Sequence, residues 1–286
     1  MKTVLVTGAS GFLGHHLVQE LLKEGSTEVI AILGRPEDKV NMLPQSERVR
    51  VYPCSDIFTK EFGHIDTLIH TAFSRSEDLS GLSSSIEFTR KIIAMVNERD
   101  IDSIINISSQ GVYKGQQPGQ KATEDSVIEP NTAYGLAKWC VENMIEIGCR
   151  KPFTSIRMAS LSANARFLMF FVNSIKEGKD IIVTSPNQYA SIMDVSDAVS
   201  GIKSAMNIPI SKRQTIYNLG PGVQYSILEY AQIINSIGQE LKFTPANIYV
   251  DDKGSKYAIC MDCQRLITDA GWTPKVTKEK IIKNLF

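Results

Sequence analysis

A glycine-rich segment near the N-terminus constrains the fold more than any other part of this sequence. It reads Thr7-Gly8-Ala9-Ser10-Gly11-Phe12-Leu13-Gly14 and lies between a β-branched run, Thr3–Val6, and an amphipathic stretch, Phe12–Lys23. Glycines there permit a tight turn from strand to helix and let the two elements pack closely. A strand, a glycine turn and a helix in this order open a βαβ unit, which predicts a parallel sheet.

The same segment predicts a site for the phosphates of a dinucleotide. Its glycines let the backbone approach a pyrophosphate, and the helix start supplies free N–H groups and the positive end of the helix dipole. A glycine-rich turn can also be only a structural device. Because strand and helix flank this one correctly, we favour the dinucleotide site, which is assigned to Gly8, Ser10, Gly11, Phe12, Leu13 and Gly14.

Strands and helices alternate along the rest of the first half. Strands are expected at Glu28–Leu33, Val49–Pro53, Thr67–His70, Ser103–Ile107 and Ser155–Met158, and helices at about Ser83–Glu98 and Pro130–Gly148. The strand segments are apolar without polar alternation, which is typical of strands covered on both faces. We therefore expect an α/β fold with a doubly wound, Rossmann-type parallel sheet over residues 1–158.

After residue 158 the alternation loosens, and we expect a smaller lobe over residues 159–286. Helices are predicted at Arg166–Ile175, at Val195–Met206 and at Ser226–Ile237, the last with Ser226 as its N-cap, and a strand at Thr215–Leu219. Elements between about 195 and 219 are expected to return to the sheet. No Gly/Ser/Pro-rich linker separates the two parts.

Composition excludes several classes of protein. The chain has 31 basic and 31 acidic residues in 286, so no net field attracts nucleic acid or an anionic membrane. No apolar run approaches the roughly 20 residues that span a bilayer, and no signal peptide is evident, which predicts a cytoplasmic protein. Cys260 and Cys263 form a CxxC, but without a second pair or a histidine cluster we expect neither a zinc site nor a redox role.

The residue after the second predicted strand bears on the cofactor. An acidic residue there binds the ribose 2′-OH of NAD, whereas an arginine accommodates the 2′-phosphate of NADP. This strand ends in Ile32-Leu33-Gly34 and is followed by Arg35. Arg35 can also be a solvated loop charge. On this feature we favour NADP over NAD.

A tyrosine and a lysine four residues apart are the candidate residues for the chemical step. Tyr134 and Lys138 share one face of a predicted helix, where a cation favours the phenolate and so makes tyrosine a better acid or base. Alone, the pattern also fits a core-edge tyrosine beside a solvated lysine. Ser109 follows the predicted strand Ser103–Ile107, and ligands bind at the carboxyl ends of such strands. We therefore expect its hydroxyl to meet Tyr134 beside a bound nicotinamide.

Together these motifs resemble the extended short-chain dehydrogenase/reductase family, the NAD(P)-dependent epimerases and dehydratases, over nearly the whole chain. The matching segments are TGASGFLG, Asp56-Ile57, His70-Thr71-Ala72, Ile107 to Tyr113, Glu129-Pro130 before the Tyr134 helix, Tyr217 to Gly220, Asp262 to Arg265 and Ala270 to Pro274. The resemblance implies that Ser109, Tyr134 and Lys138 are catalytic, that Tyr134 and Lys138 also contact the cofactor, and that Asp56, Ile57, Thr71 and Ala72 line its site. It also implies a substrate-binding C-terminal lobe and no metal.

The resemblance further implies a homodimer, built from helices at about Thr132–Gly148 and Ser83–Glu98 with Trp139, Met144, Ile93 and Val96 as candidate contacts. It is incomplete where relatives that act on nucleotide sugars carry an arginine for the diphosphate. That position holds Ala190, the histidine of the same segment is Asp194, and an asparagine position holds Ser160. Arg166 or Lys176 could supply the missing cation.

Three functions remain in consideration. The first is hydride transfer at a hydroxyl or carbonyl carbon of a nucleotide sugar. Dehydration is least favoured, because a dehydratase needs an acidic pair next to the catalytic serine and Gln110 follows Ser109 instead. The second is NADPH-dependent reduction of a small carbonyl compound, favoured by Ala190 and Arg35. The third is a catalytically silent dinucleotide sensor, which the presence of Ser109, Tyr134 and Lys138 disfavours.

Overall fold

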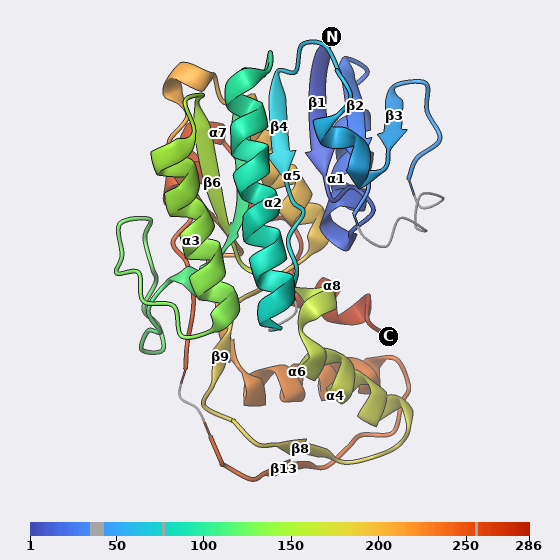
Figure 1. Cartoon of the computed structure of the whole chain (residues 1–286). Helices are drawn as coiled ribbons and strands as arrows, with labels where there is room; N and C mark the ends of the chain where they lie inside the picture. Colours follow the sequence, from blue (N-terminus) through green and yellow to red (C-terminus); the bar gives the residue numbers. More distant parts are fainter. Residues whose placement is uncertain (35–42, 76–77, 255–256) are drawn as a thin grey trace.

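A parallel sheet forms the centre of the molecule (Figure 1). The computed structural model describes residues 1–34, 43–75, 78–254 and 257–286. Seven strands pair in parallel in the order β11-β6-β5-β4-β1-β2-β3. Their bounds are Lys2–Thr7 (β1), Thr27–Ile32 (β2), Val49–Tyr52 (β3), Thr67–His70 (β4), Ile104–Ser109 (β5), Phe153–Met158 (β6) and Ile216–Leu219 (β11). The predicted α/β class with a Rossmann-type sheet is confirmed.

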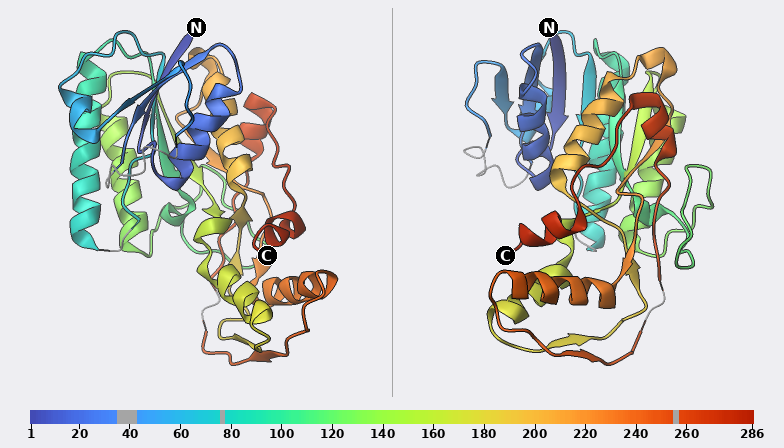
Figure 2. Two further views of the ribbon diagram at one scale, coloured as in Figure 1. Left: turned by 90° about the vertical axis from the view of Figure 1, so that its right-hand side faces the viewer. Right: turned by 180° about the vertical axis from the view of Figure 1, so that it is seen from behind.

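Helices cover both faces of this sheet (Figures 1 and 2). Helices α1 (Phe12–Leu22) and α5 (Val195–Asn207) pack together on one face, and α2 (Leu79–Glu98) and α3 (Ala133–Gly148) on the other. Leu17 of α1 and Ile92 of α2 are fully buried, and such side chains each contribute roughly 1.5–3 kcal/mol by leaving water. The apolar strands are therefore enclosed on both sides, as their sequences predict.

Helix α2 begins four residues before the predicted start at Ser83. Asp78 caps it by accepting hydrogen bonds from the backbone N–H groups of Ser80 and Gly81. The serines and glycine of this first turn have weak helix propensity, which hid the start in the sequence. Val96 was predicted as a dimer contact. It is instead fully buried in the core between α2 and the sheet, so it is not available to a partner subunit.

A second apolar core lies in the lobe below the sheet (Figure 1). The helices α4 (Arg166–Lys176) and α6 (Ile227–Glu240) pack together, and α8 (Lys278–Lys283) lies against α6. Ser226 caps α6 in a capping box with Glu229, as its sequence position predicts. Two strands absent from the prediction, β8 (Ile181–Val183) and β13 (Ile248–Val250), pair in parallel across this lobe.

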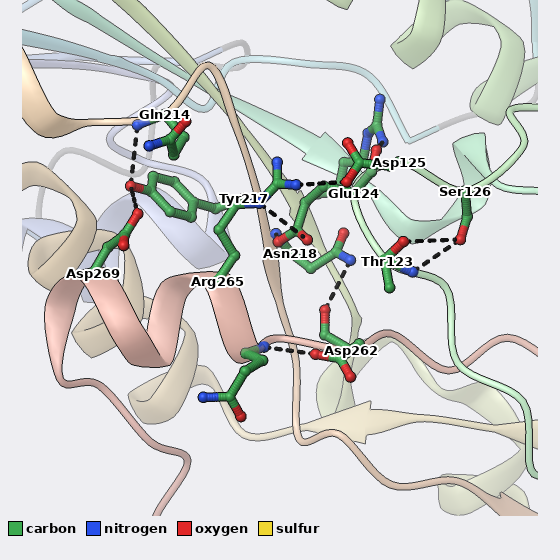
Figure 3. Close-up of polar contacts among 12 residues, drawn as sticks. Thr123, Glu124, Asp125, Ser126, Gln214, Tyr217, Asn218, Asp262, Arg265 and Asp269 are labelled. Carbon is green, nitrogen blue, oxygen red and sulfur yellow. Dashed lines mark hydrogen bonds and ion pairs between the residues drawn. The ribbon is translucent and has the colours of Figure 1, made fainter.

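The C-terminal segment contacts the edge strand β11, and Figure 3 shows polar contacts between them. Asn218 of β11 donates through Nδ2 to the carbonyl oxygen of Asp262 at 2.9 Å, and Tyr217 donates to Asp269 Oδ2 at 2.8 Å. Arg265 of α7 (Gln264–Ala270) contacts the carboxylates of Glu124 and Asp125. The elements α5, β11 and α7 therefore lie on the sheet although they follow residue 158 in the chain.

Cys260 and Cys263 are both free and buried, and burial raises the pKa of the Cys263 thiol to about 12. Such a thiol is a poor nucleophile and a poor metal ligand at neutral pH. Among the helices in the described ranges, none is long and apolar enough to cross a membrane.

Candidate active site

A cavity of about 640 Å³ opens at the carboxyl ends of the central strands. It brings together predicted residues from distant parts of the chain, as expected where parallel strands end at one edge of a sheet. Those that line it are Gly8, Gly11, Phe12, Leu13, Gly14, Thr71, Ser109, Tyr134 and Lys138. Residues from the predicted dinucleotide site and the predicted catalytic residues thus line the same cavity.

The glycine loop of this cavity has a shape that side chains would prevent. Gly8 has a φ of +68°, and a Cβ there would lie 2.9 Å from Ala72 Cα. A Cβ on Gly14 would lie 2.2 Å from the carbonyl oxygen of Gly8. Gly11 is the N-cap of α1, and no described side chain caps the helix there. The uncapped helix start leaves backbone N–H groups available, which fits the phosphates of a dinucleotide.

Hydroxyl groups fasten the loop to its neighbours. Ser10 Oγ accepts from the Gly34 N–H at 2.8 Å, and Thr71 donates to the Thr7 carbonyl oxygen at 2.7 Å. Ser10 is buried behind the cavity, and the Ala72 N–H points to Thr7 Oγ1 at 3.4 Å. These contacts join the ends of β1, β2 and β4, and so give a phosphate site a fixed backbone.

His70, the last residue of β4, is the buried centre of this junction. Its Nδ1 lies 2.8 Å from Thr7 Oγ1 and its Nε2 lies 3.0 Å from Thr89 Oγ1 of α2. Burial, and secondarily the charge of Lys138, lower the pKa of His70 to about 3. The imidazole is therefore neutral at physiological pH, and its position indicates a structural role.

Two of the residues predicted to bind cofactor, Asp56 and Ile57, lie away from the cavity. Asp56 and Ile57 occupy a short 3-10 helix, Cys54–Phe58, after β3. Asp56 pairs with Lys60 at 2.8 Å, Ile57 is fully buried in the core, and neither lines the cavity. Arg35 lies outside the residues that the structure describes.

The predicted catalytic residues lie on β5 and α3. Ser109 ends β5, and its Oγ accepts from the Gly111 N–H at 3.0 Å. Thr132 caps α3, which carries Tyr134 in its first turn and Lys138 one turn further along. Burial raises the pKa of Tyr134, while the positive charge of Arg75 acts in the opposite direction. Because an apolar enclosure opposes the phenolate, this tyrosine needs a cation beside it to ionise.

Lys138 is almost wholly buried, which is unusual for a lysine. Its Nζ donates to the Ile107 carbonyl oxygen of β5 at 2.7 Å. Burial, and secondarily the charge of Arg75, lower its pKa to about 7, against the opposing influence of Glu142. At neutral pH the ammonium is therefore close to losing its proton, so the charges around it decide whether it stays a cation.

Phe73 and Arg75 are two of the cavity residues that the sequence did not predict. Both lie in the loop between β4 and α2 and line the cavity, and Arg75 is exposed there. Their position could have predicted this, because they follow the His70-Thr71-Ala72 segment at the carboxyl end of a strand, where ligands bind. Arg166 and Lys176, the two cations predicted to replace the missing arginine, do not line the cavity. Lys176 donates instead to the Leu285 carbonyl oxygen at 3.3 Å.

The positions that depart from the family pattern are also placed. Ser160 lines the cavity, and its Oγ accepts from Gln110 Nε2 at 3.1 Å. Asp194 is the N-cap of α5, where its carboxylate accepts from the Ser196 N–H at 2.8 Å. Ala190 lies in the short strand β9 (Tyr189–Ala190), and Gln188, which precedes this strand, lines the cavity. These three positions therefore carry a hydroxyl, a carboxylate and a methyl group, and none of them supplies a cation.

Comparison with known proteins identifies a family. The sequence model of the NAD-dependent epimerase/dehydratase family matches residues 4–220. A putative UDP-glucose 4-epimerase of Methanocaldococcus jannaschii is 26% identical over 99% of this chain and 96% of its own length. An uncharacterized UDP-glucose epimerase of Bacillus subtilis is 24% identical over 91% of this chain and 92% of its own length.

Solved structures share the fold. UDP-glucuronic acid 4-epimerase of Bacillus cereus, in complex with a fluorinated UDP-glucuronic acid and NAD, superposes with a TM-score of 0.81 at 20% identity over 99% of this chain and all of that one. UDP-glucose 4-epimerase of Thermotoga maritima, with UDP-glucose, gives 0.79 at 20% identity over 98% of this chain and 96% of that one.

Proposed function

The chain belongs to the NAD-dependent epimerase/dehydratase family, and we propose that it is a nucleotide-sugar epimerase that transfers hydride at a hydroxyl-bearing carbon of the sugar. One observation carries this proposal: a single cavity contains both the glycine loop and the group formed by Ser109, Tyr134 and Lys138. A phosphate site and an acid/base pair in one space allow a dinucleotide and a sugar hydroxyl to lie side by side.

Each residue has a role that follows from its environment. When bound, the nicotinamide supplies the hydride acceptor and donor. Tyr134 takes the proton from the substrate hydroxyl and returns it, because a phenolate beside a cation is a competent base. Lys138 provides that cation and, being tied to the carbonyl oxygen of Ile107, cannot move away. Ser109 holds the substrate oxygen by a hydrogen bond from the strand end.

Arg75 supports a substrate that carries phosphate. Among the described residues that line the cavity, Arg75 and Lys138 are the cationic ones, and Arg75 is the exposed one. Guanidinium groups bind phosphate in two-pronged geometry and keep their charge at every physiological pH. In our proposal Arg75 takes over phosphate recognition that relatives assign to the position of Ala190. The relatives and structural neighbours named above are described as acting on, or bound to, UDP-sugars.

Reduction of a small carbonyl compound is the second candidate. Ala190 supports it, because this residue stands where relatives that act on nucleotide sugars carry an arginine for the diphosphate. Cofactor turnover distinguishes the two reactions. Purified protein is incubated with UDP-, dTDP- and GDP-sugars and with simple aldehydes and ketones, and cofactor absorbance and sugar products are followed together. An epimerase forms the epimer with no net change in NAD(P)H, whereas a reductase consumes one NAD(P)H per product. Binding of cofactor without either product would support the silent sensor.

Two further properties are proposed with this function. We propose NADP over NAD, on Arg35 and on the absence of a carboxylate at Ile32-Leu33-Gly34. This preference would separate the chain from structural neighbours that are complexed with NAD. We also propose a homodimer formed through α2 and α3. An apolar groove between these helices supports it, and Trp139 and Met144 line that groove as candidates from the sequence.

A further inference from the structure

A buried carboxylate lies directly behind the proposed catalytic residues. Glu142 follows Lys138 by one turn of α3, and both face the sheet. Its exposed fraction is 6%. It accepts a short hydrogen bond from Ser108 Oγ, and Arg157 donates to it through Nη2 at 2.8 Å and through Nε at 3.1 Å. Ser108 immediately precedes Ser109, so this carboxylate adjoins both halves of the proposed site.

Arg157 is itself held on several sides. It lies on β6, level with Ser108 of β5 and with Asn218 of β11. Its Nη1 donates to Tyr113 Oη at 2.9 Å and to the Glu124 carbonyl oxygen at 3.0 Å, and Tyr113 in turn donates to Asn218 Oδ1 at 2.6 Å. The guanidinium therefore presents a fixed face to Glu142.

Stability alone is a poor reason for this arrangement. Replacing a buried ion pair by apolar residues of similar volume is often neutral or stabilising, because the two charges lose their hydration. A lysine, a glutamate and an arginine are nevertheless buried together, and the lysine is the one that lines the cavity. The charge on Glu142 is therefore better explained by what it does to its neighbours in the site.

We infer that Glu142 is a positioning residue for the proposed hydride transfer: its carboxylate keeps Lys138 charged and, through Ser108, holds Ser109 against the cavity. The inference rests on the proposed roles of Lys138 and Ser109. Two contacts between α3 and the end of β5, one from Lys138 to Ile107 and one from Ser108 to Glu142, fix the lysine and the serine relative to each other. Tyr134 lies on the same helix as Lys138, so these contacts also fix its position relative to Ser109.

The other charges near Lys138 make the carboxylate necessary. Arg75, from the loop after β4, opposes the ammonium, and His70 at the end of β4 stays neutral and supplies no counter-charge. Tyr134, on the same helix, is neutral until it gives up its proton. Arg157, from β6, is a cation that pairs with the carboxylate itself. Among these groups Glu142 is the anion that favours the charged lysine.

Lysine NMR gives a readout that does not depend on activity. In protein labelled with ¹³Cε-lysine, Lys138 should titrate near pH 7, apart from exposed lysines near ~10.4, and its signal is assigned by its loss in Lys138→Ala. Glu142→Gln should lower this midpoint by about one unit, since a neighbouring charge typically shifts a pKa by 1–3 units. An unchanged midpoint would overturn the electrostatic part of the inference.

Turnover and a matched control complete the test. Glu142→Gln should reduce kcat at least about tenfold with little change in KM, and should move the alkaline limb of the pH profile, where Lys138 loses its charge, to lower pH, because removing an anion eases proton loss. Asp197→Asn provides the control. Asp197 is a buried carboxylate that accepts from the backbone N–H groups of Lys275 and Val276. This variant should lower Tm while leaving the lysine midpoint and the pH profile unchanged.

Ser108→Ala keeps the inference testable if Glu142→Gln fails to fold. It removes the hydroxyl and leaves the pair of Glu142 and Arg157 intact. We expect a lower kcat with an unchanged lysine midpoint, and wild-type kcat would overturn the positioning of Ser109. If the wild-type protein forms no product from any nucleotide sugar, the proposed function fails, whereas the midpoints in Glu142→Gln and Asp197→Asn still decide the role of the carboxylate.

Discussion

The ammonium of Lys138 lies 3.9 Å from the centre of the Phe73 ring, and the same ring meets that of Tyr134 edge-on with centroids 6.0 Å apart. One aromatic side chain thus contacts both members of the proposed acid/base pair. Its face attracts the cation by roughly 0.5–2 kcal/mol, while its bulk excludes water that would stabilise the same charge. Because the pKa of Lys138 is lowered to about 7, dehydration by the whole enclosure outweighs the attraction.

Phe73→Ala should therefore raise the pKa of Lys138 by admitting water to the ammonium. Phe73→Leu is the matched variant, since it keeps an apolar cover without the aromatic face and should lower the pKa slightly below the wild-type value. The ¹³Cε-lysine titration described above measures both. Equal midpoints in wild type and Phe73→Ala would mean that other side chains exclude the water.

Tyr134→Phe should reduce turnover by ~10²–10⁴, the usual contribution of a positioned acid or base. The change removes only the hydroxyl, so folding and cofactor affinity should alter little. Ser109→Ala should lower turnover with cofactor binding nearly intact, and Lys138→Ala should weaken both. Turnover on the substrate found in the panel and cofactor titration by calorimetry measure these effects. Near wild-type turnover in Tyr134→Phe would place the chemistry on other residues.

His70 predicts a loss of stability in mild acid. Its pKa falls from 6.5 to about 3 on folding because it is buried, so below pH 6.5 the unfolded chain binds a proton that the folded one does not. The free energy of unfolding should decrease as pH falls from 6.5 towards 3. His70→Asn, which keeps a donor and an acceptor, should show a shallower decrease in urea unfolding at pH 7, 6, 5 and 4. Parallel curves for the two proteins would refute this linkage.

NADPH should bind more tightly than NADH if Arg35 contacts the 2′-phosphate. Arg35→Ala should then weaken NADPH binding and leave NADH binding unchanged, because NADH has no phosphate at that position. Fluorescence titration with both cofactors measures the difference, and Arg166→Ala, a cation outside the cavity, serves as the control. Equal or tighter binding of NADH by the wild type would show that Arg35 is a surface charge.

Elements with strong local signals were predicted well from the sequence. The glycine segment, flanked by an apolar strand and an amphipathic helix, predicted β1, α1 and the start of the cavity. Ser109, Tyr134 and Lys138 were found because residue type and spacing both pointed to chemistry, and all three line the cavity. Tertiary contacts accounted for the rest. β8 and β13 have three residues each, and they are stabilised by pairing across the lobe and by burial of Ile181 and Val183 in its core.

Glu142 shows the same limit within the site. In the sequence it is one of two glutamates on a helix, the other being Glu146, and an exposed surface is the usual place for glutamate. Only the pairing of β5 with β6 brings Arg157 level with Ser108 and thus places an arginine beneath that helix face. A buried ion pair between distant segments leaves no periodic signal, whereas the four-residue spacing of Tyr134 and Lys138 does.

A homodimer is the last expectation, and the surface between α2 and α3 provides its test. The groove there is almost wholly apolar, with Ile147 exposed to 86%, Leu136 to 54% and Trp139 to 38%. Burial of such side chains contributes roughly 1.5–3 kcal/mol each, so one charge in the groove should dissociate a dimer. Light scattering should give twice 31.7 kDa for the wild type and 31.7 kDa for Ile147→Asp. Ile182→Asp, at an exposed site in the lobe (54%), should stay dimeric, and a wild-type monomer at micromolar concentration would contradict the prediction.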